Sequence, residues 1–501
     1  MNLLRIEGVN HAHCIGDTED LATRRGGGLM LLNATDAVAQ ALQGVAEAVS
    51  TGASAGLFRI TDSAGADDGT LERVRTTLAG EVFRNGTFVV SRAVGADFPR
   101  TEQQALNHGR WQQMQRLSFS TAGLKPTQAG ACEVDRVRPV ASWRMVGGEA
   151  DTGVSLSVAE RRSYGNQMKQ RFYRRELEAL PATDRPDGWD EALRYTHTFE
   201  QLSCGPRQPA DSHLDGKMAV FYADGNSFGA KVAACTTPAA LTAWESFLKK
   251  RRRRFLARLI ERARGDSRWQ NAGEIRLETP LWGGDEFMLI VPAWCGFELA
   301  QLFLDEVADL RYPETDRTDA SRLTHACGLV FCSHKTPISH IAALAKRLAE
   351  QGKQDGKADD ILNWLVLESL DHAGDSLAQY LKQRFPDRPD MTWKALALEA
   401  STLDTLRTTL PALKDELPRS AITRAARMLA AGSEIGHDLL KASYAQVSDA
   451  MKGTHADAWQ KLWQALHPDR PTWSATPSPA DLPAWLKLIE TWDYVVEGGQ
   501  A

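Results

Sequence analysis

The sequence predicts an α+β protein that ends in a helical domain. Up to Lys357, apolar runs of strand length alternate with longer segments of helical periodicity. From Ala358 onward the pattern is helical, interrupted by breaks rich in proline, glycine and aspartate, such as residues 387–389 and 468–471. A chain of 501 residues has room for about three domains, because single cores rarely exceed about 250 residues.

The most informative local feature is a glycine-rich turn followed by two acids. Residues 283–286 have the sequence Gly-Gly-Asp-Glu and separate two strand-like segments, 276–282 and 287–294. Glycine adopts positive φ without steric cost, so the glycine pair predicts a two-residue hairpin turn of the primed type. Asp285 and Glu286 then lie at a strand tip, where neighbouring carboxylates are most readily held ionised by divalent cations.

A further acid follows a buried strand elsewhere in the chain. Residues 217–223 form a nearly continuous apolar run, typical of a strand buried on both faces, and Asp224 comes directly after it. If this strand pairs with the hairpin, Asp224 meets Asp285 and Glu286. Carboxylate oxygens are the ligands that Mg²⁺ and Mn²⁺ prefer, and glycines without side chains leave room for a nucleotide. The sequence therefore predicts a metal site for phosphate chemistry.

Two more elements follow the hairpin. Residues 323–332 are predicted as a third strand, and residues 337–353 as an amphipathic helix with its apolar residues on one face. Pro337 suits the first helical turn and Gly352 suits the end of the helix. A basic pair at this end, Lys353 with Lys357 one turn on, is chemically suited to a triphosphate.

In this order, the segments resemble the palm domains of nucleotide cyclases. The matching motifs are Asp224-Gly225-Asn226, Gly283-Gly284-Asp285-Glu286-Phe287, Thr324-His325-Ala326-Cys327-Gly328, and Pro337-Ile338 followed by Ala345 and Gly352-Lys353. The GGDEF diguanylate cyclases look like this, and so does the large polymerase-like subunit of type III CRISPR effectors, which makes cyclic oligoadenylates from ATP. The resemblance covers residues 215–365 well and residues 1–125 weakly.

Three features favour the CRISPR subunit over the diguanylate cyclases. Gly229 stands where GGDEF enzymes usually carry a lysine, and residues 276–279 lack their Arg-x-x-Asp inhibition motif. Residues 24–32 resemble the first, non-catalytic palm of the CRISPR subunit. The resemblance thus implies two ferredoxin-like palm domains with a linker region between them and a C-terminal α-helical domain. The implied boundaries are 1–128 for the first palm, 129–212 for the linker region, 213–365 for the catalytic palm and 366–501 for the helical bundle.

The resemblance implies a metal-dependent nucleotidyltransferase that makes cyclic or linear oligonucleotide second messengers from ATP, in CRISPR-type or related anti-phage defence. The expected catalytic residues are Asp224, Asp285 and Glu286. The same acids, with the carbonyl group of Gly225, are expected to hold two Mg²⁺ or Mn²⁺ ions per active site. The residues expected to contact the nucleotide are Asn226, Ser227, Phe228, Gly283, Gly284, Lys353 and Lys357.

Two positions depart from the CRISPR pattern, and other interpretations stay open. Asn226 stands where the relatives usually have a second acid, and Glu286 where they usually have aspartate.

The alternatives are a catalytically silent palm protein that serves as a scaffold or RNA-sensing subunit, and a diguanylate cyclase. Beyond ATP, the expected partners are guide or target RNA and other CRISPR-type subunits, or a second copy of the chain.

Composition indicates a cytoplasmic globular protein without a membrane partner. Hydrophobic residues make up 43% and charged residues 25% of the chain, and no apolar run approaches the ~20 residues of a membrane span. The seven cysteines include no Cys-x-x-Cys pair, so neither disulfides nor a zinc ribbon is expected. The net charge of −5 gives no global attraction to nucleic acid.

Three smaller motifs carry weaker expectations. Residues 249–254, Lys-Lys-Arg-Arg-Arg-Arg within a predicted helix 238–264, suggest a solvated helix face or a contact with triphosphate, RNA or an acidic subunit. Residues 24–28 suggest a glycine-rich loop before a helix, or a phosphate contact. His437-Asp438 lacks the further ligands of a metal phosphohydrolase, so nuclease activity is not predicted.

The remaining predicted elements complete the pattern. In the N-terminal region strands are expected at 1–8, 53–60, 86–93 and 132–143, and helices at 38–49, 71–82, 101–117 and 159–180. C-terminal helices are expected at 361–370, 378–384, 393–399, 403–414, 420–431, 437–451, 459–466 and 482–494.

Overall fold

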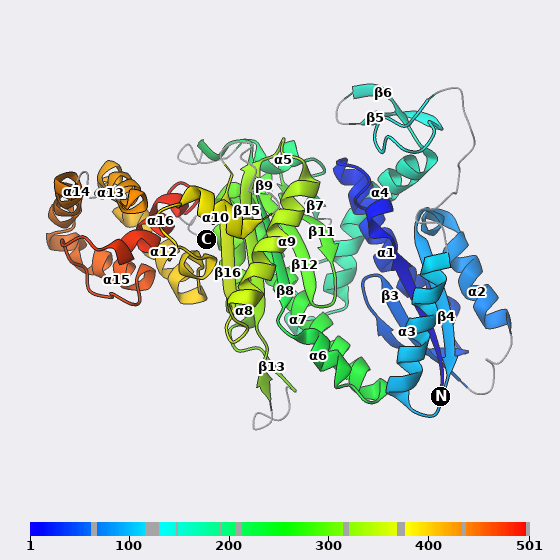
Figure 1. Cartoon of the computed structure of the whole chain (residues 1–501). Helices are drawn as coiled ribbons and strands as arrows, with labels where there is room; N and C mark the ends of the chain where they lie inside the picture. Colours follow the sequence, from blue (N-terminus) through cyan, green and yellow to red (C-terminus); the bar gives the residue numbers. More distant parts are fainter. Residues whose placement is uncertain are drawn as a thin grey trace. The chain divides into compact units, whose positions relative to one another are not determined.

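The fold is a mixed α/β architecture with a helical C-terminal region (Figure 1). The computed structural model describes residues 1–61, 68–115, 130–146, 149–190, 193–205, 213–313, 320–367, 376–432 and 437–496. The chain divides into two compact units. The first holds Met1–Thr198, Ser227–Arg258 and Glu278–Met288, and the second holds Phe199–Asn226, Leu259–Leu277 and Leu289–Ala501. The domain boundaries predicted at residues 128 and 212 lie outside the described residues.

The first unit is built on a four-stranded antiparallel sheet. Its central strand β1 (Asn2–Val9) pairs with β3 (Ala55–Ile60) on one side and with β4 (Thr87–Val94) on the other. Strand β2 (Ala46–Thr51) pairs with β3, so the order across the sheet is β2-β3-β1-β4. The strands expected at 1–8, 53–60 and 86–93 are therefore confirmed.

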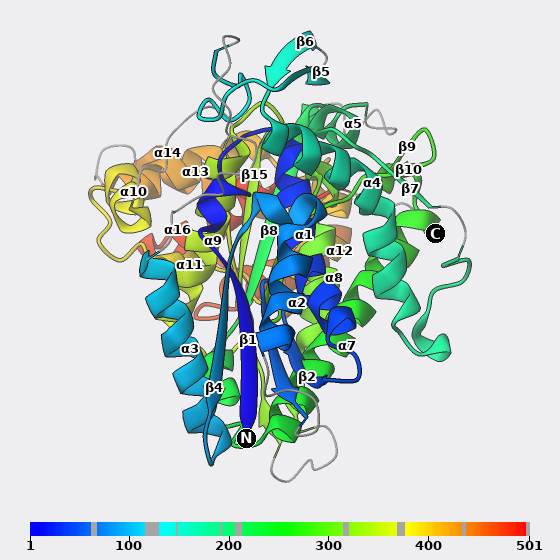
Figure 2. The ribbon, with the colours of Figure 1, turned by 90° about the vertical axis from the view of Figure 1, so that its right-hand side faces the viewer.

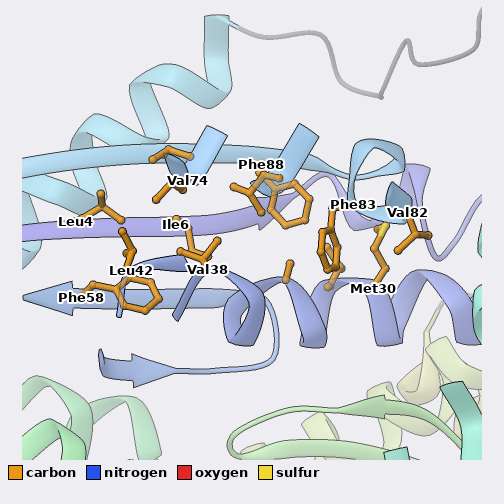
Figure 3. Close-up of a cluster of buried hydrophobic side chains, with 14 of the residues drawn as sticks. Leu4, Ile6, Met30, Val38, Leu42, Phe58, Val74, Val82, Phe83 and Phe88 are labelled. Atoms are coloured by element: carbon orange, nitrogen blue, oxygen red, sulfur yellow. The ribbon is translucent and has the colours of Figure 1, made fainter. Parts of the chain in front are cut away.

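Helices cover both faces of this sheet. Helices α1 (Leu21–Ala41) and α2 (Asp68–Ala79) pack on the face that Figure 3 shows. Their shared core contains Leu4, Ile6, Met30, Val38, Leu42, Phe58, Val74, Val82, Phe83 and Phe88. Helix α3 (Phe98–Gln115) lies along β1 and β4 (Figure 2), and the hydroxyl group of Ser91 donates to the carbonyl oxygen of Ala105 at 2.7 Å. Because Ser91 follows a core residue, strand alternation puts α3 on the opposite face.

The glycines at 26–28 lie inside α1, so the expectation of a glycine-rich loop is wrong. Helix α1 begins after Asp20, whose carboxylate caps it by accepting from the backbone N–H of Thr23 at 2.8 Å. It packs against α4 (Leu156–Glu178). A Cβ atom at Gly26 would lie 1.8 Å from the carbonyl oxygen of Arg161, so glycine is needed for the two helices to approach closely.

Two other expectations for this region are also wrong. The helix expected at 38–49 begins earlier and ends at Ala41, because residues 46–51 pair with β3 as an edge strand. The strand expected at 132–143 is replaced by a hairpin further along, formed by β5 (Ser142–Val146) and β6 (Glu149–Val154). In both cases strand pairing decided the outcome, and pairing is invisible in a single segment.

A buried charge cluster joins β11 (Glu278–Trp282) to α1 and α4 in the first unit. The Glu278 carboxylate lies 2.6 Å from the guanidinium of Arg25 and 2.7 Å from the ammonium of Lys169, and all three side chains are buried. Burial alone would raise the pKa of Glu278, but Arg25 and Lys169 lower it to about 2. The first unit also contains α6 (Phe228–Ala233) and most of α7 (Pro238–Gly265).

The second sheet has the order β11-β12-β8-β15-β16. Strand β12 (Glu286–Pro292) follows β11 in the chain. In the second unit, β8 (Lys217–Gly225) runs antiparallel to β15 (His325–Ser333), and β15 runs parallel to β16 (Ile361–Val366). The expectation of a helix at 361–370 is therefore wrong over 361–366. A short buried apolar run cannot be told from a helical segment by periodicity, and here its neighbour β15 makes it a strand.

Helices α8 (Gly296–Val307) and α9 (Ile338–Asp355) cover opposite faces of β8 and β15. The ring of Phe221 contacts Phe303 of α8, with ring centroids 5.5 Å apart, whereas the next residue, Tyr222, faces Lys346 of α9. Helix α9 confirms the helix expected at 337–353. Sequence reasoning missed α8, although Glu298, Gln301, Asp305 and Glu306 recur at helical spacing along a segment that is otherwise mostly buried.

The C-terminal region of the second unit is helical, as predicted. Its helices are α10 (Leu377–Arg384), α11 (Trp393–Leu396), α12 (Ala400–Leu413), α13 (Arg419–Ala431), α14 (His437–Ala450), α15 (Ala456–Leu466) and α16 (Leu482–Thr491). A cluster of aromatic rings, including Trp459, Trp463, Trp473 and Trp485, fills its interior. The remaining short elements are β7 (Arg194–Tyr195), α5 (Phe199–Ser203), β9 (Gln270–Asn271), β10 (Glu274–Ile275), β13 (Arg311–Tyr312) and β14 (Ser321–Arg322). Within the described segments, no helix combines the length and apolar character that crossing a membrane requires.

Candidate functional site

The last two residues of β8, Asp224 and Gly225, meet a lysine in the second unit. The carboxylate oxygen Oδ2 of Asp224 lies 2.6 Å from Nζ of Lys353, in the last turn of α9. The same ammonium group donates to the carbonyl oxygen of Gly225 at 3.3 Å. Both side chains remain partly exposed, at 17% for Asp224 and 23% for Lys353, so the pair is open to a ligand. We name this group of atoms the Asp224 loop site.

A glycine in β15 makes this meeting possible. A Cβ atom at Gly328 would lie 1.9 Å from the carbonyl oxygen of Ala345, so the backbone of α9 rests directly on β15. Close to the end of α9, a Cβ atom at Gly352 would lie 2.9 Å from Cγ2 of Ile361 on β16. These two close approaches fix the last turn of α9 against the sheet, and Lys353 follows Gly352 directly.

Asn226 is anchored beside the same loop by Thr324. The backbone N–H of Asn226 donates to the carbonyl oxygen of Thr324 at 2.8 Å, and its side-chain Nδ2 donates to Oγ1 of Thr324 at 3.0 Å. The Thr324 hydroxyl group in turn donates to the carbonyl oxygen of Lys357 at 2.7 Å. Asn226 is 7% exposed, yet within the described residues its amide oxygen Oδ1 has no hydrogen-bond partner. Thr324 belongs to a matching motif, but its anchoring role was not predicted.

The hairpin turn in the first unit differs from the predicted turn. The N–H of Gly283 donates to the carbonyl oxygen of Glu286 at 2.8 Å, so the turn residues are Gly284 and Asp285. Neither glycine has positive φ, and the prediction of a primed turn centred on the two glycines is wrong. Glycine is needed at 283 for another reason: a Cβ atom there would lie 2.6 Å from the Glu286 carbonyl oxygen. Asp285 and Glu286 are both half-buried.

The first unit contains a pocket beside this turn, with a cavity volume of about 210 Å³. Gly284 and Asp285 line it together with Phe228 and Gly229, which follow Ser227. Ser227 has a left-handed backbone, with φ of 61°, and precedes α6. Such a conformation is uncommon for a residue other than glycine and redirects the chain sharply at this point.

Apolar, basic and acidic side chains line the pocket. We name its apolar members, Leu32, Phe228, Val232, Trp244 and Leu248, the apolar wall, and its basic members, Arg175, Lys249, Arg252 and Arg253, the cationic wall. The acids that line it are Asp36, Glu176, Glu245 and Asp285, and Arg175, Lys249 and Arg253 form ion pairs with Asp36, Glu176 and Glu245. An apolar surface beside several cations suits a ligand that carries both a flat ring and phosphate groups.

Three residues of the basic run on α7, Lys249, Arg252 and Arg253, line this pocket. Residues 251–254 are half-buried, so the expectation of a solvated helix face is wrong for them. Arg253 donates to the carboxylate of Glu176 at 3.1 Å. The guanidinium of Arg252 lies 4.7 Å from the ring centroid of Trp282, and burial lowers the pKa of Arg252 to about 10. Lys249 donates to Oγ1 of Thr51 at 2.6 Å, and burial lowers its pKa as well.

The predicted site residues thus form two groups. The Asp224 loop site joins Asp224, Gly225, Asn226, Lys353 and, through its backbone, Lys357, whose side chain is exposed. The first unit holds Ser227, Phe228, Gly283, Gly284, Asp285 and Glu286. Asp224 belongs to the second unit, whereas Asp285 and Glu286 belong to the first. The expected meeting of these three acids therefore stays a prediction. Over the residues that the structure describes, no three Asp, Glu, His or Cys side chains gather as a metal-binding group.

The Asp224 loop site nevertheless has the chemistry of a cation site. The Lys353 ammonium, a cation, contacts two of the oxygens that the sequence assigned to a metal, the Asp224 carboxylate and the Gly225 carbonyl. The adjacent Asn226 supplies a buried amide oxygen that lacks a donor among the described residues. Carboxylate, carbonyl and amide oxygens are the ligands that Mg²⁺ and Mn²⁺ take, so these residues fit such an ion.

Comparison with known proteins supports the fold. No protein-family model matches the sequence, and no curated protein matches it. Among solved structures, Csm1 from T. onnurineus superposes with a TM-score of 0.52 at 13% identity, over 99% of this chain and 69% of that one. A Csm1-Csm4 cassette in complex with one ATP gives a TM-score of 0.51 at 12% identity, over 99% and 70% of the two chains. The same cassette in complex with pppApA gives 0.51 at 12% identity, over 98% and 69%.

These identities are low, so the likeness concerns the fold. The chain has the fold of Csm1, the large subunit of a type III CRISPR effector, over almost its whole length. This agrees with the resemblance of its motifs to that subunit.

Proposed function

We propose that this protein is a metal-dependent nucleotidyltransferase that joins ATP into cyclic or linear oligoadenylates as part of a CRISPR-type effector. The observation that carries the proposal is the pocket beside the hairpin turn, which Gly284 and Asp285 line together with apolar and basic side chains. The fold neighbours support the same substrate, since Csm1-Csm4 structures contain ATP and pppApA.

The two sheets support a pair of ferredoxin-like palm domains. In the first, the elements β1-α1-β2-β3-α2-β4 give the sheet order β2-β3-β1-β4. In the second, β8-α7-β11-β12-α8-β15 gives the order β11-β12-β8-β15, with β16 added at the edge. Both follow the split β-α-β pattern of ferredoxin-like folds. We propose that the second is the catalytic palm, because only its first strand ends in an acid and only its hairpin carries two.

We propose that a nucleotide lies in the pocket with its base on the apolar wall. Phe228 and Trp244 make a buried edge-to-face pair with ring centroids 5.3 Å apart, so the more exposed Leu32, Val232 and Leu248 would contact the base. The phosphates would then meet Arg252 and its neighbours, since guanidinium groups bind phosphate oxygens in pairs of hydrogen bonds.

Asp224 and the Gly225 carbonyl, with Asp285 and Glu286 from the hairpin, would hold the divalent ions of the catalytic palm. When bound, such ions lower the pKa of an attacking hydroxyl group and neutralise the charge of the departing phosphates. The role of the protein is to place these oxygens at strand ends that are fixed by the sheet, while Lys353 offers positive charge to the triphosphate.

The proposed reaction is a nucleotidyl transfer. A ribose hydroxyl oxygen of one nucleotide forms a bond to the α-phosphorus of another, and the bond from that phosphorus to the bridging oxygen of pyrophosphate breaks. Pyrophosphate leaves with the electron pair of that bond, and the hydroxyl proton passes to water. Repeating the step lengthens the chain, and attack by the terminal hydroxyl group on the first α-phosphorus closes a ring.

The test is incubation of the purified protein with Mn²⁺ or Mg²⁺ and each labelled nucleoside triphosphate. We expect an oligonucleotide product from ATP that disappears in an Asp285→Ala/Glu286→Ala variant. The control is Asp415→Ala/Glu416→Ala, which removes the same two residue types at adjacent but exposed positions. A product from GTP alone would instead identify a diguanylate cyclase. No product with any nucleotide, together with no ATP binding by calorimetry, would favour a silent scaffold.

A further inference from the structure

The Asp224 loop site already contains a positive charge of its own. The ammonium of Lys353 lies 2.6 Å from the Asp224 carboxylate and 3.3 Å from the Gly225 carbonyl oxygen. An ammonium group is strongly hydrated and exchanges readily, on a flexible stem of four carbons. It can therefore neutralise the carboxylate without committing the site to one geometry.

We propose that Lys353 is an exchangeable counter-cation: it holds the Asp224 loop site when no divalent ion is bound, and it moves to the triphosphate when a metal and a nucleotide enter together. This inference rests on the proposed function for the identity of the nucleotide, but the competition between Lys353 and a metal does not depend on catalysis. In this proposal Lys353 pairs with two anionic partners in turn, first the Asp224 carboxylate and then the phosphates.

The geometry explains why the exchange is possible. Lys353 is in the last turn of α9, and the backbone of this turn is held by the close contact of Gly352 with Ile361. The anchored backbone limits the movement to the side chain. The pair is partly exposed, so water and ions reach it, and a partly exposed ion pair is weak enough to exchange.

Asn226 strengthens the argument for a competing cation. Its side-chain Nδ2 is used by Thr324, whereas its buried Oδ1 lacks a hydrogen-bond donor among the described residues. A buried acceptor without a partner costs free energy, which a bound cation would recover. The neutral amide leaves Asp224 as the one carboxylate among residues 224–226, and Lys353 pairs with it. The sequence departure at Asn226 and the lysine at 353 are then parts of one arrangement.

The proposal predicts that removing the Lys353 ammonium has opposite effects on two binding measurements. Without nucleotide, Lys353 competes with a divalent ion, so Lys353→Met should bind free Mn²⁺ about tenfold more tightly than the unchanged protein. With a non-hydrolysable ATP analogue and Mn²⁺ present, the same variant should bind the analogue about tenfold more weakly, because it lacks a cation for the phosphates. A lysine that only bound phosphate would change the second measurement and not the first.

The experiment measures Mn²⁺ binding by electron paramagnetic resonance and analogue binding by calorimetry on the full chain. Lys335→Met is the matched control: it removes an exposed lysine that follows β15 at the end paired with Lys217, the opposite end of β8 from Asp224. Asp224→Asn should remove the tight Mn²⁺ site. The double variant Asp224→Asn/Lys353→Met should not recover tight Mn²⁺ binding.

Unchanged or weaker Mn²⁺ binding in Lys353→Met would overturn the proposal, and so would an equal gain in Lys335→Met. Absence of Mn²⁺ binding in every variant would overturn it too. If oligonucleotide synthesis is absent but Lys353→Met still tightens Mn²⁺ binding, the counter-cation stands and the proposed reaction fails. The two ideas are thereby tested separately.

Discussion

Gly328 of β15 and Ala345 of α9 approach so closely that a Cβ atom at Gly328 would lie 1.9 Å from the Ala345 carbonyl oxygen. This contact sets the depth at which α9 lies on the sheet. Since Lys353 is two turns further along α9, the contact also sets where its ammonium group reaches Asp224. Packing in the core and geometry in the candidate site are therefore linked through one residue without a side chain.

The first prediction concerns this contact. Gly328→Ala should lower the free energy of unfolding by about 3 kcal/mol, because overpacking a tight helix–sheet contact forces a backbone shift. It should also weaken binding of the ATP analogue by moving Lys353. Urea unfolding measures the first effect. Gly265→Ala, at a position where a Cβ atom meets nothing within 4 Å, is the control and should leave stability nearly unchanged.

The second prediction concerns the buried charge cluster of the first unit. Glu278→Gln would leave Arg25 and Lys169 buried without their carboxylate and should cost about 3–5 kcal/mol of stability at pH 7. The pKa of Glu278 falls from 4.5 in the unfolded chain to about 2 in the folded protein. Because folding lowers the pKa of this carboxyl group, its ionised form stabilises the folded state above pH 4.5. This contribution to stability disappears as the pH falls toward 2.

The pH dependence gives a second readout for the same residue. Denaturant unfolding between pH 6 and pH 3 should show a smaller loss of stability in Glu278→Gln than in the unchanged protein, because the variant has no carboxyl group to protonate at this position. Parallel pH profiles for the two proteins would contradict the assignment of this acid-sensitive contribution to Glu278.

The third prediction separates binding from stability in the pocket. Burial lowers the pKa of Arg252 to about 10, which means that the fold bears a cost for keeping this guanidinium charged. Arg252→Met should therefore change the free energy of unfolding by no more than about 1 kcal/mol, while it weakens binding of the ATP analogue about tenfold. Calorimetry and thermal melting test the two halves. Lys250→Met, an exposed neighbour on the same helix, should change neither; a large loss of stability in Arg252→Met would assign Arg252 a structural role instead.

The fourth prediction concerns Lys487 in α16. Burial lowers its pKa from 10.5 to about 8, although Glu399 and Asp469 act in the opposite direction. Between pH 8 and pH 10.5 the unfolded chain binds this proton more tightly than the folded protein, so stability should rise with pH across that window. Lys487→Met should stabilise the protein by about 3 kcal/mol at pH 7, and the gain should vanish above pH 10.5.

Thermal or urea unfolding at pH 7 and at higher pH measures this effect. Lys382→Met, which removes an exposed lysine from α10, is the control and should show no such pH-dependent gain. A destabilised Lys487→Met variant at pH 7 would show that the lysine makes a favourable contact stronger than its burial cost.

The sequence by itself determined the elements whose signal is local. The apolar run that ends in Asp224, the glycine-acid turn before β12, and the amphipathic pattern of α9 each follow from the side chains of one short segment. Short motifs in their order also indicated the fold that Csm1 shares. The existence of these elements is predictable because hydrophobic period and helix ends depend on neighbouring residues, whereas the type and centre of the turn at residues 283–286 differ from the prediction.

Tertiary structure decided everything that depends on residues far apart in the chain. The glycines of α1 lie in a helix because α4 packs there, residues 361–366 form a strand because β15 runs alongside, and the basic run of α7 is half-buried because Glu176 and Trp282 meet it. The contact between Asp224 and Lys353 spans 129 residues and follows from Gly328 and Gly352. Sequence patterns specify which face of an element is apolar, but the partner of that face, and thus the environment of each charge, is fixed only when the elements pack.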